Sequence, residues 1–300
     1  GDSTHTNAKD TVREAKQFLT FSDSRQAAAF YASYMDETYR GILYKRLIVE
    51  TLSTNNEPQD FDIFIDNLTC QFERYNVCGE EKNALRKEPW KAILAELVDS
   101  NGNTSLYRTG LLSIKLDGSN IPGNAKWNLS AQEVRSLCSE FILGMMNDAA
   151  ISYPVPMTPL DREFFTHGGF ESSYTLSAPA ANRQQKAFIP SRKNLSNRRL
   201  DYLQRVYQKC CGPAETELLI KGLEDIWEYI LRSNKYIIAE NGVYRVNPNK
   251  LVLSAGNELY RCNTCHRVTV NNVKNVCPSY RCNGELGSIK PDEFFAGNHY

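Results

Sequence analysis

The sequence has 300 residues with 35 basic and 35 acidic side chains, so its formal net charge is zero and no overall field indicates a nucleic-acid partner. The length is sufficient for two or three compact units. No apolar run approaches the ~20 residues of a membrane span, and the polar residues 1–17 do not resemble a signal peptide. Nine cysteines without the spacing of a secreted disulfide scaffold favour a reducing compartment, so we expect a cytoplasmic protein without a membrane partner.

Residues 1–50 are expected to contain a short strand followed by a long helix. Residues 18–21 are an apolar, β-prone run of the kind that lies buried in a parallel sheet. Asp23 can cap the next helix, with Gln26 at the third position of a capping box, and an apolar period near 3.6 continues beyond it. Because a parallel strand needs partners and the next segments read as helices, this strand indicates the edge of a sheet completed elsewhere.

Residues 51–180 are expected to form a helical body. The periodicity predicts helices over about 59–78 and 80–99, and Ser130 with Glu133 forms a capping box for a third helix that ends near residue 148. Residues 108–116 are consistent with either a strand or a short helix, and a Gly/Pro/Asn-rich loop follows them. Residues 152–192 hold five of the twelve prolines and little periodicity, so we expect an extended, partly ordered arm on the helical body.

Residues 181–256 are expected to hold a basic helix over 196–209, an amphipathic helix from Pro213 and a hairpin. The pair Asn241-Gly242 lies between two β-prone runs, which is a strong signal for a two-residue hairpin turn. A helix followed by a hairpin is typical of a winged helix. An ordinary α+β packing unit is the alternative.

A basic segment covers residues 183–209, in which Asp201 is the only acid and tyrosines are interleaved. Cations with aromatic rings suit a nucleic-acid backbone and stacked bases. The alternative is a solvated helix face with ion pairs to acidic helices. The residues that we expect to bind nucleic acid here are Arg192, Lys193, Arg198, Arg199 and Arg205.

Residues 257–300 contain the strongest pattern, Cys262-x2-Cys265, eleven residues, then Cys277-x4-Cys282. Two such knuckles bring four thiolates to one ion, and a closed set of four leaves no position for water. We therefore predict a structural zinc ion. The alternatives are two disulfides, four unrelated cysteines, a rubredoxin-like iron on the same ligands, and competition from the adjacent His266.

No catalytic machinery is found in the sequence. It has no G-x4-G-K-[ST] phosphate loop, no G-x-G-x-x-G and no D-E-x-[DH] box preceded by an apolar strand. The adjacent Cys210 and Cys211 lack a local activator beyond Lys209, so they are interpreted as ordinary cysteines. We therefore expect that this chain alone is not an enzyme.

The segment Phe18 to Phe30, which reads F-L-T-F-S-D-S-R-Q-A-A-A-F, resembles motif IV of large bacterial superfamily-two DEAD/DEAH-box helicases. The stretch Thr109 to Leu112, the pairing of Phe188-Ile189-Pro190 with Asn197 to Leu203, and the four-cysteine module are similar to the same family. In that family such a region is an insertion in the second RecA-like domain, between motifs IV and V. The chain ends at 298–300, where that sheet would resume, so the resemblance implies an excised insertion.

The resemblance also implies where nucleic acid approaches the start of the chain. The residues at that strand end are Ser22, Asp23, Ser24 and Arg25. A helix cap without nucleic-acid contact is the alternative for the same residues. The ATP-binding and arginine-finger residues lie outside this chain, so ATP and magnesium are expected only in the parent helicase, an ATP hydrolase.

The sequence thus predicts a mainly α chain with small β parts, consisting of a helical body, a winged-helix-like unit and a C-terminal zinc ribbon. The first functional hypothesis is an accessory, nucleic-acid-engaging region of an ATP-dependent DNA helicase or translocase. Its partners would be DNA, with RNA not excluded, and the remainder of the helicase chain. The second hypothesis is a free-standing zinc-containing module that binds DNA or docks on a protein.

Overall fold

The structure is a computed structural model that describes residues 25–54, 57–79, 82–100, 102–118, 120–166, 171–177, 184–191 and 195–290, with side chains from residue 38 onward. The strand expected at residues 18–21 and the expected helix cap Asp23 lie outside these ranges. The chain divides into two compact units, Gly1–Ile42 and Leu43–Tyr300. None of the described helices is both long and apolar enough to cross a membrane.

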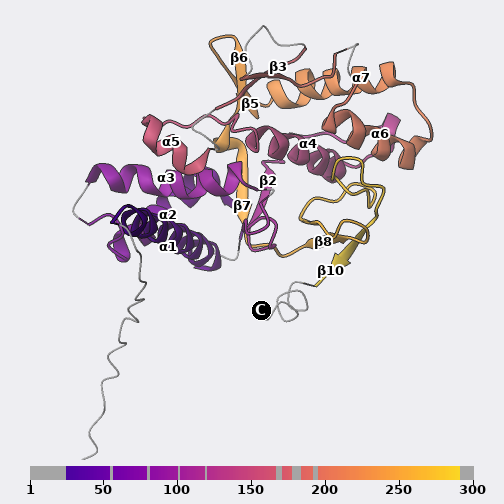
Figure 1. The fold of residues 1–300 in the computed structure, drawn as a ribbon. Helices are drawn as coiled ribbons and strands as arrows, with labels where there is room; N and C mark the ends of the chain where they lie inside the picture. The colour runs from indigo at the N-terminus through magenta and orange to yellow at the C-terminus, as the bar shows by residue number, and fades with distance from the viewer. Residues whose placement is uncertain are drawn as a thin grey trace, which may run out of the picture. The chain divides into compact units, whose positions relative to one another are not determined.

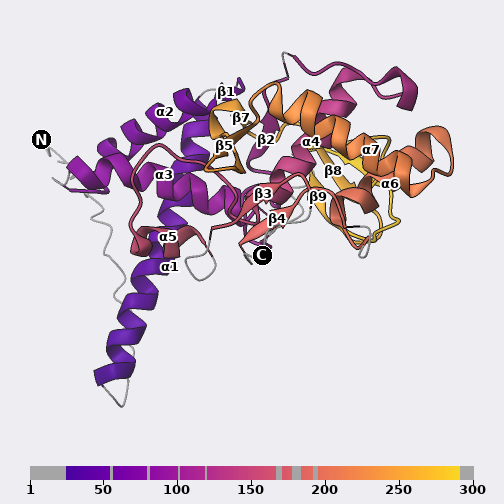
Figure 2. The same ribbon diagram turned by 90° about the horizontal axis from the view of Figure 1, so that it is seen from above.

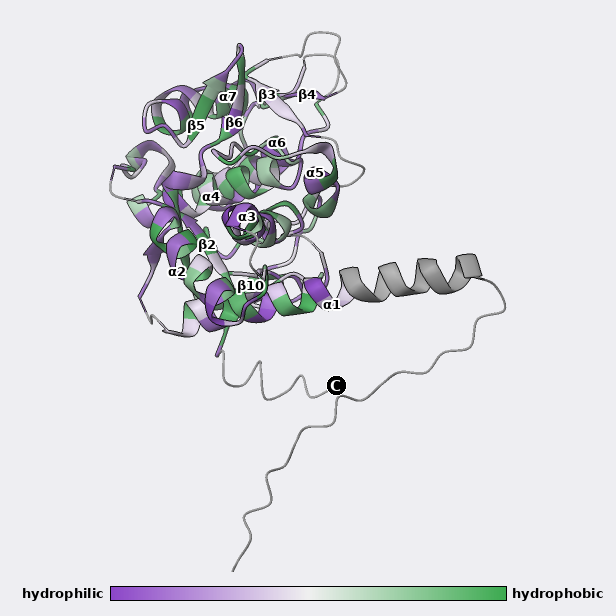
Figure 3. Cartoon of the chain, turned by 90° about the vertical axis from the view of Figure 1, so that its left-hand side faces the viewer, coloured by the Kyte–Doolittle hydropathy of each residue, from purple (hydrophilic) through white to green (hydrophobic). Residues whose placement is uncertain are grey.

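The expectation of a mainly α chain with small β parts is confirmed for the described residues (Figures 1 and 2). Each predicted helix is present, although its bounds shift by a few residues. Figure 3 shows apolar and polar residues alternating along α2, as in a helix that buries one face. The α-helices are α1 (Arg25–Thr54), α2 (Phe61–Arg74), α3 (Lys82–Val98), α4 (Ala131–Met146), α5 (Pro159–Phe165), α6 (Arg198–Cys211) and α7 (Thr216–Asp225), which continues as the π-helical segment η3 (Ile226–Arg232).

Helix α4 is the central element of the second unit and begins at the predicted capping box. The Ser130 hydroxyl accepts the backbone N–H of Glu133 at 3.2 Å, and the Glu133 carboxylate accepts the backbone N–H of Ser130 at 2.8 Å. Both bonds satisfy N–H groups that the first turn leaves without a helical partner. Almost every residue from Val134 to Met146 is buried, so α4 is covered on several faces.

The strands of the described residues form three small sheets. In the first, β7 (Leu251–Ser254) pairs antiparallel with both β1 (Gln59–Asp60) and β2 (Ser113–Leu116), so the ambiguous segment 108–116 contains a strand. The second has the order β4-β3-β6-β5, and the third has the order β10-β8-β9. Their strands are β3 (Ser173–Thr175), β4 (Gln185–Ala187), β5 (Ile237–Glu240), β6 (Val243–Val246), β8 (Leu259–Cys262), β9 (Val268–Thr269) and β10 (Leu286–Ile289).

The predicted hairpin is confirmed as β5–β6, with Asn241 and Gly242 in the turn at φ of 51° and 80°. Both positive angles are those of a type I′ turn, which explains the Asn-Gly pair. The hairpin is one half of the second sheet, because β3 of the proline-rich arm pairs with β6. The arm is also more regular than expected, since Thr158 and Asp161 form a second capping box that starts α5 at Pro159.

The cysteine module packs against the helical body through the segment that joins its two cysteine pairs. Val268, Val270, Val273 and Val276 are buried in the same core as α4, whereas Cys262, Cys277, Cys282 and Leu286 form a small separate cluster. The joining segment therefore supplies apolar surface to the main core. The three buried cysteines of the module lie outside that core.

A buried polar network ties the same segment to α4 through Glu140. One carboxylate oxygen of Glu140 accepts hydrogen bonds from Tyr107, Thr269 and Asn271, at 3.2, 3.0 and 3.0 Å. The other oxygen accepts Nη2 of Arg267 at 3.1 Å, and these side chains are 5% and 13% exposed. Burial alone lowers the pKa of Arg267, but the Glu140 carboxylate outweighs it and raises that pKa.

We predict that Glu140→Ala lowers the free energy of unfolding by about 3–5 kcal/mol, because it leaves the buried Arg267 cation without its partner. Urea denaturation followed by circular dichroism measures the change.

Two further variants test whether the pair causes this loss. Glu163→Ala removes an exposed carboxylate on α5 and should change stability by less than about 0.5 kcal/mol. The double variant Glu140→Met with Arg267→Met removes both charges and should recover much of the loss. A double variant as unstable as Glu140→Ala would contradict a role for the unpaired charge.

Candidate metal centre and its surroundings

The first cysteine pair lies on the turn between β8 and β9. The Cys262 sulfur accepts the backbone N–H groups of Thr264 at 3.4 Å and Cys265 at 3.5 Å. His266 adopts a positive φ of 58° and donates its N–H to the Cys262 carbonyl at 3.1 Å, which closes the turn. Backbone donors of this kind stabilise a thiolate rather than a thiol.

The second pair lies on a loop that begins at Cys277 and returns at Cys282. The Cys282 N–H donates to the Ser279 carbonyl at 3.1 Å, and the Gly284 N–H points at the Cys282 sulfur at 3.5 Å. A Cβ atom at Gly284 would lie 2.4 Å from the Cys262 sulfur, so this position admits only glycine. The glycine thus allows the two loops to approach each other.

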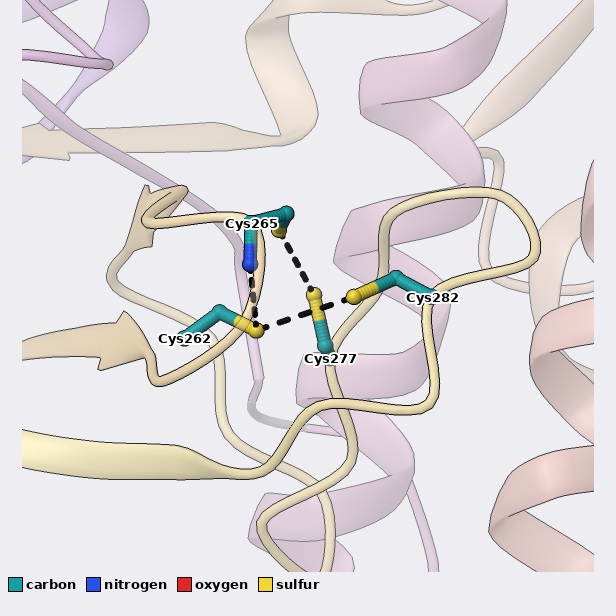
Figure 4. A group of neighbouring side chains, drawn as sticks. All are labelled: Cys262, Cys265, Cys277 and Cys282. Atoms are coloured by element: carbon teal, nitrogen blue, oxygen red, sulfur yellow. Dashed lines mark hydrogen bonds between the residues drawn. The ribbon is translucent and has the colours of Figure 1, made fainter.

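The four sulfur atoms converge on one point (Figure 4). All lie within 4.8 Å of one another, with 3.7 Å between Cys262 and Cys282 and 3.5 Å between Cys265 and Cys277. A tetrahedron of sulfurs at ~2.3 Å from a metal has edges of ~3.8 Å, whereas a disulfide bond measures ~2.05 Å. The spacing is that of ligands around an ion, and none of the nine cysteines, all of which are described, forms a disulfide. These four residues can hold a metal ion.

Burial makes two of the four thiols costly to ionise unless a cation is present. It raises the pKa of Cys277 and of Cys282. Burial also acts to raise the pKa of Cys265, but its hydrogen bonds with the Ser279 side chain and with the backbone outweigh burial and lower that pKa to about 6. A divalent cation would compensate the negative charge of the set, and four sulfur ligands would complete its tetrahedral shell.

The other candidate ligands named from the sequence do not join the cluster. Among the described residues, these four cysteines are the only group of three or more His, Cys, Asp or Glu side chains arranged to hold a metal. His266 is exposed beside Cys265 and is not one of the group.

Arg205, predicted to bind nucleic acid, instead braces the second loop from α6. Its Nη1 donates to the carbonyl oxygens of Cys277 at 2.5 Å and Cys282 at 2.6 Å, and its Nη2 donates to that of Ser279 at 3.0 Å. Asp201 accepts this guanidinium at 2.8 Å and the backbone N–H of Arg281 at 3.1 Å. With its side chain only 13% exposed, Arg205 has a structural role.

The remaining predicted nucleic-acid residues fall into three groups. Arg198 is exposed in the first turn of α6. Arg199 is half-buried, donates to the carbonyls of Phe188 at 3.0 Å and Ala187 at 3.1 Å, and lies over the Phe188 ring. Arg25 begins α1, but its side chain is not described. The others lie outside the described residues: Ser22, Asp23, Ser24, Arg192 and Lys193.

Sequence reasoning missed an exposed aromatic and basic pair inside the second loop. The Arg281 guanidinium lies 5.0 Å from the centre of the Tyr280 ring, and both side chains are exposed. The Tyr280 hydroxyl is 2.7 Å from the Ser196 hydroxyl, which places the loop beside the start of α6. Their position between Cys277 and Cys282 was the available signal, since a loop between two candidate ligands is closely constrained at both ends.

Comparison with protein-family models, with curated proteins and with solved structures found no match to this chain.

We predict one tightly bound metal ion per chain and its loss in Cys277→Ser, because three thiolates cannot close the tetrahedral shell. Elemental analysis of protein purified under reducing conditions measures the ratio. The variant should also lose local order around the ribbon, since metal-binding free energy becomes folding free energy in small sites.

Cys70→Ser is the matched control, because Cys70 is an exposed cysteine on α2 outside the cluster. It should retain the full metal content. A purified wild-type protein with neither zinc nor iron, or a Cys277→Ser variant with unchanged metal content, would contradict the site.

Proposed function

We propose that the four-cysteine site holds a structural zinc ion. Four thiolates suit a borderline-soft ion that accepts tetrahedral geometry and has no redox chemistry. A rubredoxin-like iron uses the same ligands. Elemental analysis distinguishes the two metals directly.

We further propose that the zinc ribbon and the start of α6 form a nucleic-acid-binding face, here called the α6–knuckle face and consisting of Arg198, Tyr280 and Arg281. The carrying observation is that these exposed cations and an exposed ring lie on two segments joined by the Tyr280–Ser196 and Arg281–Asp201 hydrogen bonds. Cations attract the phosphate backbone, and an aromatic ring offers a stacking surface for a base.

The winged-helix element of the prediction remains a proposal with less support. Helix α7 and η3 precede the hairpin β5–β6, which gives the order of elements in a winged helix. However, Arg245 of the hairpin pairs with Glu240 at 3.1 Å and Glu171 at 3.5 Å, so its charge is already compensated. We therefore assign the main contact to the α6–knuckle face.

At the level of the whole protein, we propose an accessory region of an ATP-dependent DNA helicase, without ATPase motifs of its own. Two observations support this proposal. One is the sequence resemblance, and the other is that the four-cysteine site would leave a bound metal no open position for a reacting water or substrate. The parent reading frame is the test. A phosphate loop and a D-E-x-[DH] box upstream would support the helicase, whereas their absence would favour a free-standing zinc module.

We predict that Arg198→Gln combined with Arg281→Gln weakens binding to single-stranded DNA of many sequences alike, because phosphate contacts carry no sequence information. The slope of log affinity against log salt should fall by about 0.7–1 for each lost contact. Fluorescence anisotropy over a salt series measures both quantities.

Arg86→Gln is the control, since Arg86 is an exposed cation on α3, away from the α6–knuckle face. It should leave the slope unchanged. If the double variant and this control bind with the same affinity and slope, the α6–knuckle face is only a solvated surface.

A further inference from the structure

A cavity of about 360 Å³ lies beside the start of α6, between α4 and the second cysteine loop. Its volume is at the lower end of the range for ligand pockets. The exposed Arg198 and Ser196 are among its lining residues, and Tyr202 and Arg267 contribute buried groups to it. The cavity thus adjoins the α6–knuckle face but extends below the surface.

Two buried polar atoms on residues that line the cavity have no hydrogen-bond partner among the described residues. They are the hydroxyl of Tyr202, a residue only 2% exposed, and Nε of Arg267. Buried polar atoms are nearly always paired, so each of these indicates an absent partner. Arginine can only donate, and a tyrosine hydroxyl can donate as well as accept. A hydrogen-bond acceptor is therefore the one kind of partner that would satisfy both atoms.

The charge of the lining favours an anion. Four cationic side chains, Lys186, Arg198, Arg199 and Arg267, face two carboxylates, Glu140 and Asp148. Lys186 pairs with Asp148, and Arg267 pairs with Glu140, so the other two cations supply the excess.

The N-terminus of α6 adds to this preference. The Asn197 side chain caps it by accepting the N–H groups of Arg199 and Leu200, at 2.9 and 3.1 Å. The partial positive charge of a helix start still favours a nearby anion.

We infer that this cavity binds the terminal phosphate of a nucleic-acid strand. A phosphate monoester carries nearly two negative charges at neutral pH, which matches the cationic excess, and its oxygens accept the two buried donors. An internal phosphodiester carries one charge and needs an exit for the chain on both sides. The identity of the strand rests on the proposed function, whereas the anion site itself does not.

The test compares oligonucleotides of one sequence that end in a 5′-phosphate, a 3′-phosphate or a hydroxyl. One of the two phosphorylated strands should bind the wild-type chain about tenfold more tightly than the hydroxyl form, as expected for hydrogen bonds to a charged group. Tyr202→Phe removes only the unpaired hydroxyl, and it should bring this ratio close to one. Tyr207→Phe, on the same helix but outside the cavity, should keep the wild-type ratio.

Inorganic phosphate provides a second measurement that needs no oligonucleotide. It should raise the unfolding temperature of the wild-type chain more than that of Tyr202→Phe, with chloride at equal ionic strength as the reference. If no strand binds, the proposed function fails and this measurement alone decides on the cavity. Equal binding of phosphorylated and hydroxyl strands by the wild-type chain would overturn the terminal-phosphate assignment, and equal thermal shifts in both proteins would overturn the anion site.

Discussion

The structure of the C-terminal ribbon depends on the convergence of four thiols whose sulfur atoms lie within 4.8 Å of one another. Thiolates at such distances repel one another unless a cation lies among them, and burial adds to this cost at Cys277 and Cys282. The surrounding backbone is arranged for that charged state, since Cys262 and Cys282 receive N–H donors and Gly284 leaves room for the opposite loop. The four sulfur atoms are therefore positioned to hold a metal ion.

The two cysteine loops also position the α6–knuckle face, to which we assign nucleic-acid binding. Arg205 holds three carbonyl oxygens of the second loop, and the Arg267–Glu140 pair holds the joining segment against α4. As a result, the start of α6, the Tyr280–Arg281 pair and the cavity with its two unpaired donors lie next to one another. Removal of a metal ion held by the four cysteines is expected to disturb this whole surface, although none of the residues proposed to bind nucleic acid is one of those cysteines.

The sequence was most informative where structure depends on neighbouring residues. The Ser130 capping box, the Asn241-Gly242 hairpin and the cysteine spacing each depend on contacts within one element or loop, and the structure contains all three features. The role of Arg205 and the Glu140 network were not predictable, because their partners lie far along the chain. The sequence of a basic helix, considered alone, indicates a nucleic-acid partner. In the structure, however, Arg205 donates hydrogen bonds to backbone carbonyls of the second cysteine loop. The helicase assignment remains a prediction from resemblance.

The most direct test of a metal-centred ribbon is X-ray absorption at the zinc edge on protein purified without added metal. The account predicts a first shell of four sulfur atoms at ~2.3 Å, with no nitrogen or oxygen scatterer. A shell with a nitrogen at ~2.0–2.1 Å would show that a histidine such as His266 replaces a cysteine. That result, or a protein without zinc, would contradict the closed four-thiolate site.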